Sequence, residues 1–409
     1  MTDRTEPSAP GAASRTRKRW GRLRRRLWQP PRPHGEQPLD RDVSPLELFY
    51  DLIVVVLVGR TAEHMTDHLT WRALADFGAV FVLIWIAWLN SSLYHDLHGR
   101  EDARSRTVLL VQVLALVPVG AFIPRAGHGA AFPISTAVVF AILALIWYLA
   151  GRPSGPEYRL PNLAFVAGTA AVAAVLAATA GLSADARVLA WLVLAAAYLT
   201  GLGVILAKAP PGLAITPALI HRFGLFIIIV LGETVVGVVD GLAHEPADAL
   251  TITVGLVAVV IGFGAWWTYF DFAGHRPPRP TRTATVQWIM THLPLTAAIA
   301  AIGAAMPGLV EHAHSARTPP AIAWLLCAAT AIVLGATMTV AASLQTWHTK
   351  RTLYRLLTAA CATVAALCLA LAAAHPAPLP LGLALIVLLG TPWTLAVTRR
   401  VSNETETHH

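Results

Sequence analysis

The feature that most constrains this chain is a series of long, mostly apolar stretches. A bilayer core about 30 Å thick is crossed by a helix of about 20 apolar residues. Only 13% of the 409 residues are charged and 56% are hydrophobic, unlike the composition of soluble domains. We therefore expect an all-α, polytopic membrane helix bundle. Windows of that length predict twelve spans, near residues 45–64, 75–95, 107–124, 131–151, 161–182, 185–207, 221–242, 249–272, 284–307, 320–343, 354–374 and 378–398.

The placement of Lys and Arg residues predicts how these spans are oriented. With twelve spans, 26 of the 31 Lys and Arg residues fall on one side of the membrane and 5 on the other. Cytoplasmic loops carry such an excess. Both termini are therefore predicted to be cytoplasmic, and the high pI reflects topology rather than binding to nucleic acid.

Residues 1–44 form a basic tail that contains 11 of the Lys and Arg residues. A Pro-rich polar sequence follows its basic run, whereas a signal peptide would continue into an apolar segment. One interpretation is a largely disordered cytoplasmic tail that only fixes orientation. The other is an amphipathic helix over 15–28, whose apolar face and arginines would bind the anionic lipids of the inner leaflet.

The chain shows signs of internal duplication. Phe49 and the apolar run 52–57 match Phe223 and 226–231 at an offset of 174 residues. At an offset of 175, Tyr94-His95-Asp96 matches Tyr269-Phe270-Asp271, and Val111-Gln112 matches Val286-Gln287. Six spans per half is an even number, so both halves would insert in the same orientation, as in parallel-repeat transporters. We expect two parallel six-helix repeats, 45–207 and 208–398, followed by a cytoplasmic C-terminal tail, 399–409.

Glu233 is the charged residue expected to lie deepest in the membrane. It follows Arg222 by eleven residues, about 16 Å along a helix, which places it near the midplane. A carboxylate at that depth has to be paired, hydrated or protonated. His292 lies about nine residues into its span and is the predicted partner. Such a pair would relay protons or hold a cation, or it would be a static hydrogen bond between helices.

A second group of ionisable residues is expected near the cytoplasmic side. Glu47 and Asp51 are four residues apart on one helical face, and Asp96 and Asp271 end their spans. Arg222 is predicted to pair with Asp271 across a helical hairpin. The alternative is that these residues reach the headgroup region and only end helices. The candidate ion- or substrate-binding residues are therefore Glu233, His292, Asp51, Asp271, Arg222, Asp96 and Glu47.

Several motifs resemble one known family. Residues 45–52 (Pro-Leu-Glu-Leu-Phe-Tyr-Asp-Leu) resemble the opening motif of the bacterial low-temperature-requirement A (LtrA) family. Residues 221–226, 230–233, 266–274 and 292–294 are similar to further motifs of that family, in the same order. The resemblance covers about residues 43–398 and implies a multi-pass protein of the bacterial cytoplasmic (inner) membrane. It implies no particular substrate or mechanism.

The sequence departs from the family pattern at a few positions. Tyr50 takes the place of the usual second aromatic residue, and Arg60 and Glu63 lie where a milder polar stretch is usual. A weaker similarity connects residues 49–51 with a six-plus-six-helix family of potassium channels.

Motifs for several chemistries are missing from the sequence. It contains no phosphate-binding GxxxxGK[ST] loop, no HExxH and no GxSxG, and its three cysteines are scattered, without metal-ligand spacing. We therefore expect no cofactor, no bound metal and no enzymatic activity. A proton- or cation-coupled secondary transporter with a polar site between the halves is favoured. The alternatives are a structural or regulatory membrane protein, a passive ion channel, and an intramembrane enzyme acting on lipid.

The orientation can be tested at the loop near Glu245, which the charge distribution places outside the cell. A single cysteine introduced by Ala247→Cys should react with a membrane-impermeant thiol reagent added to intact cells. Labelling only from the cytoplasmic side would show that the predicted topology is wrong.

Overall fold

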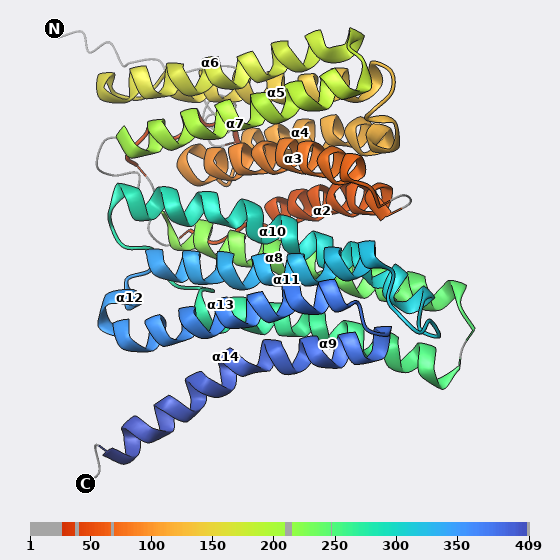
Figure 1. The fold of residues 1–409 in the computed structure, drawn as a ribbon. Helices are drawn as coiled ribbons and strands as arrows, with labels where there is room; N and C mark the ends of the chain where they lie inside the picture. Colours follow the sequence, from red (N-terminus) through yellow and green to blue (C-terminus); the bar gives the residue numbers. More distant parts are fainter. Residues whose placement is uncertain (1–26, 37–40, 67–68, 209–214, 247, 407–409) are drawn as a thin grey trace, which may run out of the picture.

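The structure is a computed structural model and describes residues 27–36, 41–66, 69–208, 215–246 and 248–406. Twelve long helices of this part lie side by side (Figure 1). They are α2 (Pro45–Thr66), α3 (Trp71–His98), α4 (Ala103–Phe122), α5 (Ala131–Gly151), α6 (Pro156–Ala178), α7 (Ala184–Lys208), α8 (Pro217–His244), α9 (Ala249–Phe272), α10 (Arg282–Glu311), α11 (Pro320–Ser343), α13 (Arg351–Ala374) and α14 (Pro378–Glu406). A short helix, α12 (Thr346–Thr349), and two 3₁₀ turns complete the described elements.

The predicted helical membrane bundle is confirmed. Eleven of the described helices, α3 to α11 with α13 and α14, are long and apolar enough to cross a membrane. Each of the eleven apolar stretches predicted from residue 75 onward coincides with one of them, because bilayer thickness fixes the length of an apolar run.

Helix α2 is the predicted first span, and its composition sets it apart. Its 22 residues include Glu47, Asp51, Arg60 and Glu63, so it is too polar to be counted with the other eleven. It nevertheless runs beside α8: Asp51 contacts Arg222, and further along both helices Gly59 lies against Glu233. Since the contacting residues advance in the same direction along both helices, α2 and α8 are parallel and lie at the same depth.

Several of the helix starts follow from capping residues in the sequence. The side chains of Thr70, Asp102, Thr216 and Thr281 each accept a hydrogen bond from a backbone amide in the first turn of the helix that follows. These amides have no partner within the helix, so the cap satisfies them and fixes where the helix begins.

The helices of the first half (α2–α7) and of the second half (α8–α14) have similar neighbours. In the first half α2 packs on α3 and α4, α4 on α5, α5 on α6, and α3 on α7. In the second half α8 packs on α9 and α10, α10 on α11, α11 on α13, and α9 on α14. The halves meet where α2, α3 and α7 face α8 and α10, so α2 lies at the centre of the molecule (Figure 1).

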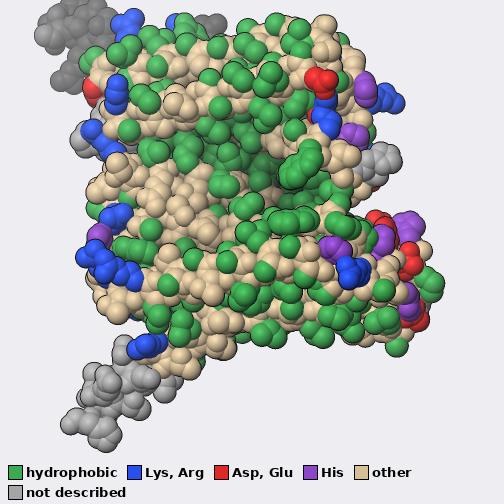
Figure 2. Space-filling view, in the orientation of Figure 1, with side chains coloured by type: hydrophobic (Ala, Val, Ile, Leu, Met, Phe, Trp, Pro, Cys, Tyr) green, Lys and Arg blue, Asp and Glu red, His purple; other side chains and the backbone are tan. Residues whose placement is uncertain are grey.

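Charged side chains lie mainly at the two ends of the bundle. Figure 2 shows Lys and Arg gathered at one end, the left in that view, and Asp, Glu and His mainly at the other. The surface between them is largely hydrophobic, and it is hollowed between the two halves.

The described part of the N-terminal segment is docked on the end of the first half. The backbone amide of Gln29 donates to Asp102 (2.8 Å), that of Arg32 to the His98 carbonyl (3.2 Å), and that of His34 to Ser154 Oγ (3.1 Å). Residues 29–34 are therefore held in place. Most of the tail that we expected to be largely disordered lies outside the described residues. The proposed amphipathic helix over 15–28 lies almost entirely outside the described residues.

Helix α8 approaches α10 much more closely than it approaches α2. A Cβ atom at Gly237 would lie 2.6 Å from the carbonyl oxygen of Gly303, and one at Gly241 would lie 3.0 Å from Cα of Pro307. Such glycines let two helix backbones pack directly against each other in a membrane.

This close approach gives a stability prediction. Gly237→Ala should lower the melting temperature of the protein in detergent, since the added methyl group meets backbone and overpacking costs about 1–3 kcal/mol. Gly232→Ala is the matched control on the same helix, because no atom lies within 4 Å of a Cβ there. Equal melting temperatures for the two variants would contradict the close α8–α10 contact.

Candidate functional site

The interface between α2 and α8 contains a buried ion pair. Arg222 Nη2 lies 2.7 Å from Asp51 Oδ1, and Nε donates to Oδ2 at 3.1 Å, so the guanidinium binds the carboxylate with two nitrogens. Its third nitrogen, Nη1, lies 3.3 Å from Glu47 Oε2. The side chains of Arg222 and Asp51 are 2% and 0% exposed. Paired, hydrogen-bonded geometry of this kind is what makes buried charges tolerable.

Aromatic rings enclose this ion pair. Trp88 of α3 donates its indole N–H to Asp51 Oδ1 at 2.8 Å. The ring of Trp88 stacks on Phe226 with centroids 4.1 Å apart, and the guanidinium carbon of Arg222 lies 5.9 Å from the Tyr50 ring centroid. The aromatic groups exclude water and hold Asp51 in its orientation.

Arg41 extends the ion pair into a longer cluster. It pairs with Glu47 and lies 3.9 Å from Asp96, which also accepts a hydrogen bond from Thr216. Three carboxylates thus alternate with two guanidinium groups. We call Asp51, Arg222, Glu47, Arg41 and Asp96 the charge cluster. It connects the N-terminal segment, both ends of the α2–α3 hairpin and the start of α8.

The predicted partner of Arg222 was wrong. Asp271 instead accepts a hydrogen bond from the indole N–H of Trp267 at 3.0 Å, and Trp267 is 37% exposed. Arg222 faces α2, the parallel neighbour of α8 at the same depth, and there it meets Asp51. The predicted hairpin of α8 and α9 exists, but the face that carries Arg222 does not point toward Asp271.

The predicted pair of Glu233 and His292 was also wrong. His292 is fully buried, and its ring nitrogens lie 3.0 Å from the Tyr269 hydroxyl and 2.6 Å from the Trp288 carbonyl. Its ring packs on Phe223, with centroids 4.8 Å apart, so it lies level with the start of α8. The residue of α10 that lies level with Glu233 is Gly303, where a Cβ would be 3.2 Å from Glu233 Cβ.

Glu233 lies against Gly59 of α2 and is half-buried. A Cβ at position 59 would be 2.7 Å from the carboxyl carbon of Glu233, so the side chain of Glu233 in this conformation fills the space left by the glycine. Within the described ranges no hydrogen bond or ion pair reaches the Glu233 carboxylate. The next carboxylate along that face of α2, Glu63, is paired with Arg60 at 2.8 Å.

Four of the seven candidate residues thus lie together in the charge cluster: Asp51, Arg222, Glu47 and Asp96. Glu233, His292 and Asp271 each lie elsewhere. Arg41, Trp88 and Thr216 were missed. Arg41 is one of many arginines in the basic tail, and nothing in the sequence marks it as a partner of Glu47. Trp88 resembles an ordinary interface anchor, so no local signal distinguishes it either. Among the described residues no group of three or more His, Cys, Asp or Glu could hold a metal ion.

Comparison with known proteins agrees with these motifs. The family described as bacterial low temperature requirement A protein (LtrA) matches residues 42–390. The chain belongs to the LtrA family. "Uncharacterized protein RA0937" of Rhizobium meliloti (strain 1021) is 24% identical over 274 residues, which are 62% of this chain. The match spans 66% of that relative, slightly less than two thirds of its length.

The structure brings two of the LtrA-like motifs together. The opening motif, residues 45–52, carries Glu47 and Asp51, and the motif at 221–226 carries Arg222. The family match confirms the resemblance seen in the sequence. In the structure, the motifs at 45–52 and 221–226 meet in one ion pair.

The ion pair can be tested by removing its partners in turn. Arg222→Met should destabilise the protein by about 3–5 kcal/mol, since an unpaired buried carboxylate remains. Adding Asp51→Asn should restore part of the loss, because the amide needs no counter-charge. Arg60→Met, which breaks an exposed pair on α2, should cost about 1 kcal/mol or less. Melting temperatures in detergent measure all three, and similar losses for Arg222→Met and Arg60→Met would argue against the pair.

Proposed function

We propose that this LtrA-family protein is a proton- or cation-coupled secondary transporter of the bacterial cytoplasmic membrane. Glu233 is the ion-binding carboxylate, and the charge cluster is a closed gate between the two halves. Both termini are cytoplasmic. The proposal involves no catalytic step and no cofactor.

The single observation that carries this proposal is the state of Glu233. It is a half-buried carboxylate at membrane depth that no described side chain neutralises. An ionised carboxylate there is costly unless a proton or a cation compensates it. A site that needs one of these ions is the basic requirement for ion coupling.

The arrangement of the helices supports a site between two repeats. Helices α2 and α8 run parallel at the centre, and their neighbours correspond in the two halves. Gly59 and Glu233, which touch, are separated by the same 174 residues as the sequence repeat. Contact between equivalent positions is expected next to an axis along the membrane normal, where parallel-repeat transporters bind substrate.

The charge cluster supports the gate. It joins α2, α3 and α8 at the end of the bundle where Lys and Arg gather, and Arg41 closes it from the N-terminal segment. Ion pairs between halves can separate and re-form as the halves rock against each other, because each partner can be rehydrated when the gate opens.

The second candidate is a structural or regulatory membrane protein. It is favoured by the dryness of the cluster, since Asp51 and Arg222 are both fully paired and 0% and 2% exposed. In that case the cluster is a permanent lock between helices, and the protein moves no ion.

Reconstituted protein distinguishes the two candidates. Vesicles containing a pH-sensitive dye should show proton movement with the wild type when a gradient of protons, Na⁺ or K⁺ is imposed. Glu233→Gln removes the titrating oxygen but keeps the shape, so it should abolish the ion-dependent flux. Asp240→Asn is the control on α8, since that carboxylate is exposed.

The outcomes are separable. A stable Glu233→Gln protein that moves ions as fast as the wild type would refute the role of Glu233. A wild type that moves neither protons nor cations, together with loss of melting temperature in Arg222→Met, would favour the structural candidate.

A further inference from the structure

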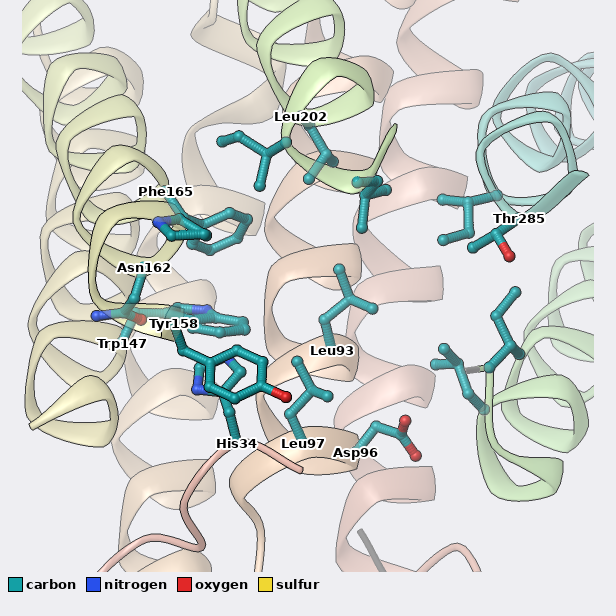
Figure 3. Close-up of a pocket in the computed structure, with 16 residues that line it drawn as sticks. His34, Leu93, Asp96, Leu97, Trp147, Tyr158, Asn162, Phe165, Leu202 and Thr285 are labelled. Atoms are coloured by element: carbon teal, nitrogen blue, oxygen red, sulfur yellow. The ribbon is translucent and has the colours of Figure 1, made fainter. Parts of the chain in front are cut away.

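A cavity separate from Glu233 opens between the halves at the end where the N-terminal segment docks (Figure 3). Its walls come from α3, α5, α6 and α7 of the first half and from α8 and α10 of the second. Most of the lining is apolar or aromatic, including Leu93, Leu97, Trp147, Phe165 and Leu202. Of this lining, the proposed function uses only Asp96.

Three polar atoms of the lining have no partner among the described residues. The indole nitrogen of Trp147 and the amide oxygen of Asn162 are buried without a hydrogen bond. Trp147 is 4% exposed and Asn162 is 7% exposed. Both contacts of Asp96, to Thr216 and Arg41, are made by Oδ1, so Oδ2 remains open. Unsatisfied buried polar atoms are costly, and each calls for a partner. The set is one donor, one neutral acceptor and one anionic acceptor.

The cavity continues into an apolar groove between α6 and α7. Phe165, Leu202 and Ile205 line both. Small residues make the groove, namely Ala164, Gly168, Ala171, Ala197 and Gly201. Along α7 it extends from Leu194 to Ile205, about 16 Å on a helix, which is close to half of the bilayer core of about 30 Å. That is the length of one acyl chain between the headgroup and the midplane.

We propose that this cavity and groove bind one membrane phospholipid whose headgroup carries a primary ammonium group. An acyl chain lies between α6 and α7. The ammonium donates to Asp96 Oδ2, and an ester or phosphate oxygen accepts from the indole N–H of Trp147, which lies across the cavity from Asp96 (Figure 3). These contacts lie on helices of the first half, and one of them, Asp96, also belongs to the charge cluster.

The carboxylate of Asp96 in the lining favours an ammonium headgroup over a purely anionic one. Asp96 is the carboxylate of the lining, and Arg41, its nearest cation at 3.9 Å, is already paired with Glu47. His34 covers the mouth, where its ring stacks on Tyr158 with centroids 5.0 Å apart. Burial lowers the pKa of His34 to about 4, so its ring is neutral at pH 7 and does not repel an ammonium.

The test measures lipid retained by purified protein. Protein is exchanged into nanodiscs or detergent containing equal amounts of phosphatidylethanolamine and phosphatidylglycerol, and the bound lipid is counted by native mass spectrometry. The wild type should retain one phosphatidylethanolamine in preference to phosphatidylglycerol. Trp147→Phe keeps the ring but removes the donor, and should weaken retention roughly fivefold, the factor that one net hydrogen bond contributes. Asp96→Asn should remove the preference between the two lipids.

Two groove variants keep the test independent of the charge cluster. Gly201 has no atom within 4 Å of a Cβ, and Gly168 has only a ring carbon of Tyr198 at 3.8 Å, so a Cβ is tolerated at either position. A leucine there is expected to extend into the groove. Gly168→Leu and Gly201→Leu should both lose the lipid. Gly335→Leu on α11, which is equally open, should retain it. Equal retention of both lipids by the wild type, or lipid still bound in both groove variants, would overturn the proposal.

Discussion

The ion pair between Arg222 and Asp51 is the interaction on which the centre of the molecule depends. Both groups lie deep enough to be almost fully removed from solvent, where a lone charge is costly and a well-bonded pair is tolerable. Because Asp51 and Glu47 belong to α2, this helix cannot face lipid on that side. On that side it packs on α3, α4, α8 and α10, whereas Phe49, Leu52 and Val56 are about half exposed.

Helix α8 makes two different kinds of contact with its parallel neighbours. Toward α10 the backbones meet through Gly237, Gly241 and Gly303, with little room for relative movement. Toward α2 the contact consists of the charge cluster at one level and Glu233 against Gly59 at another. The α2–α8 contact, made by charged side chains and by Glu233 against Gly59, can separate more readily than the close backbone packing of α8 on α10. We therefore expect α8 and α10 to move as one body relative to α2.

The spans were predictable and the pairing was not, for a physical reason. Apolar run length follows directly from bilayer thickness, and capping residues such as Thr216 and Thr281 mark where helices begin. Depth can be estimated by counting residues, but pairing also depends on how each helix is rotated and on where it starts. His292 shows this: counted from its span it seemed level with Glu233, yet it packs on Phe223, ten residues earlier on α8.

The two acidic positions of the central interface differ in how their charge is compensated. Asp51 has a guanidinium and an indole N–H as partners, so its charge is compensated whatever the surrounding solution contains. Glu233 has no such partner in the described chain, and the glycine opposite it leaves only space. Its compensation must then come from outside the protein, as a proton, a cation or water. A change in the ion supply is therefore expected to alter the free energy of the Glu233 site and to leave the pairing of Asp51 with Arg222 nearly unchanged.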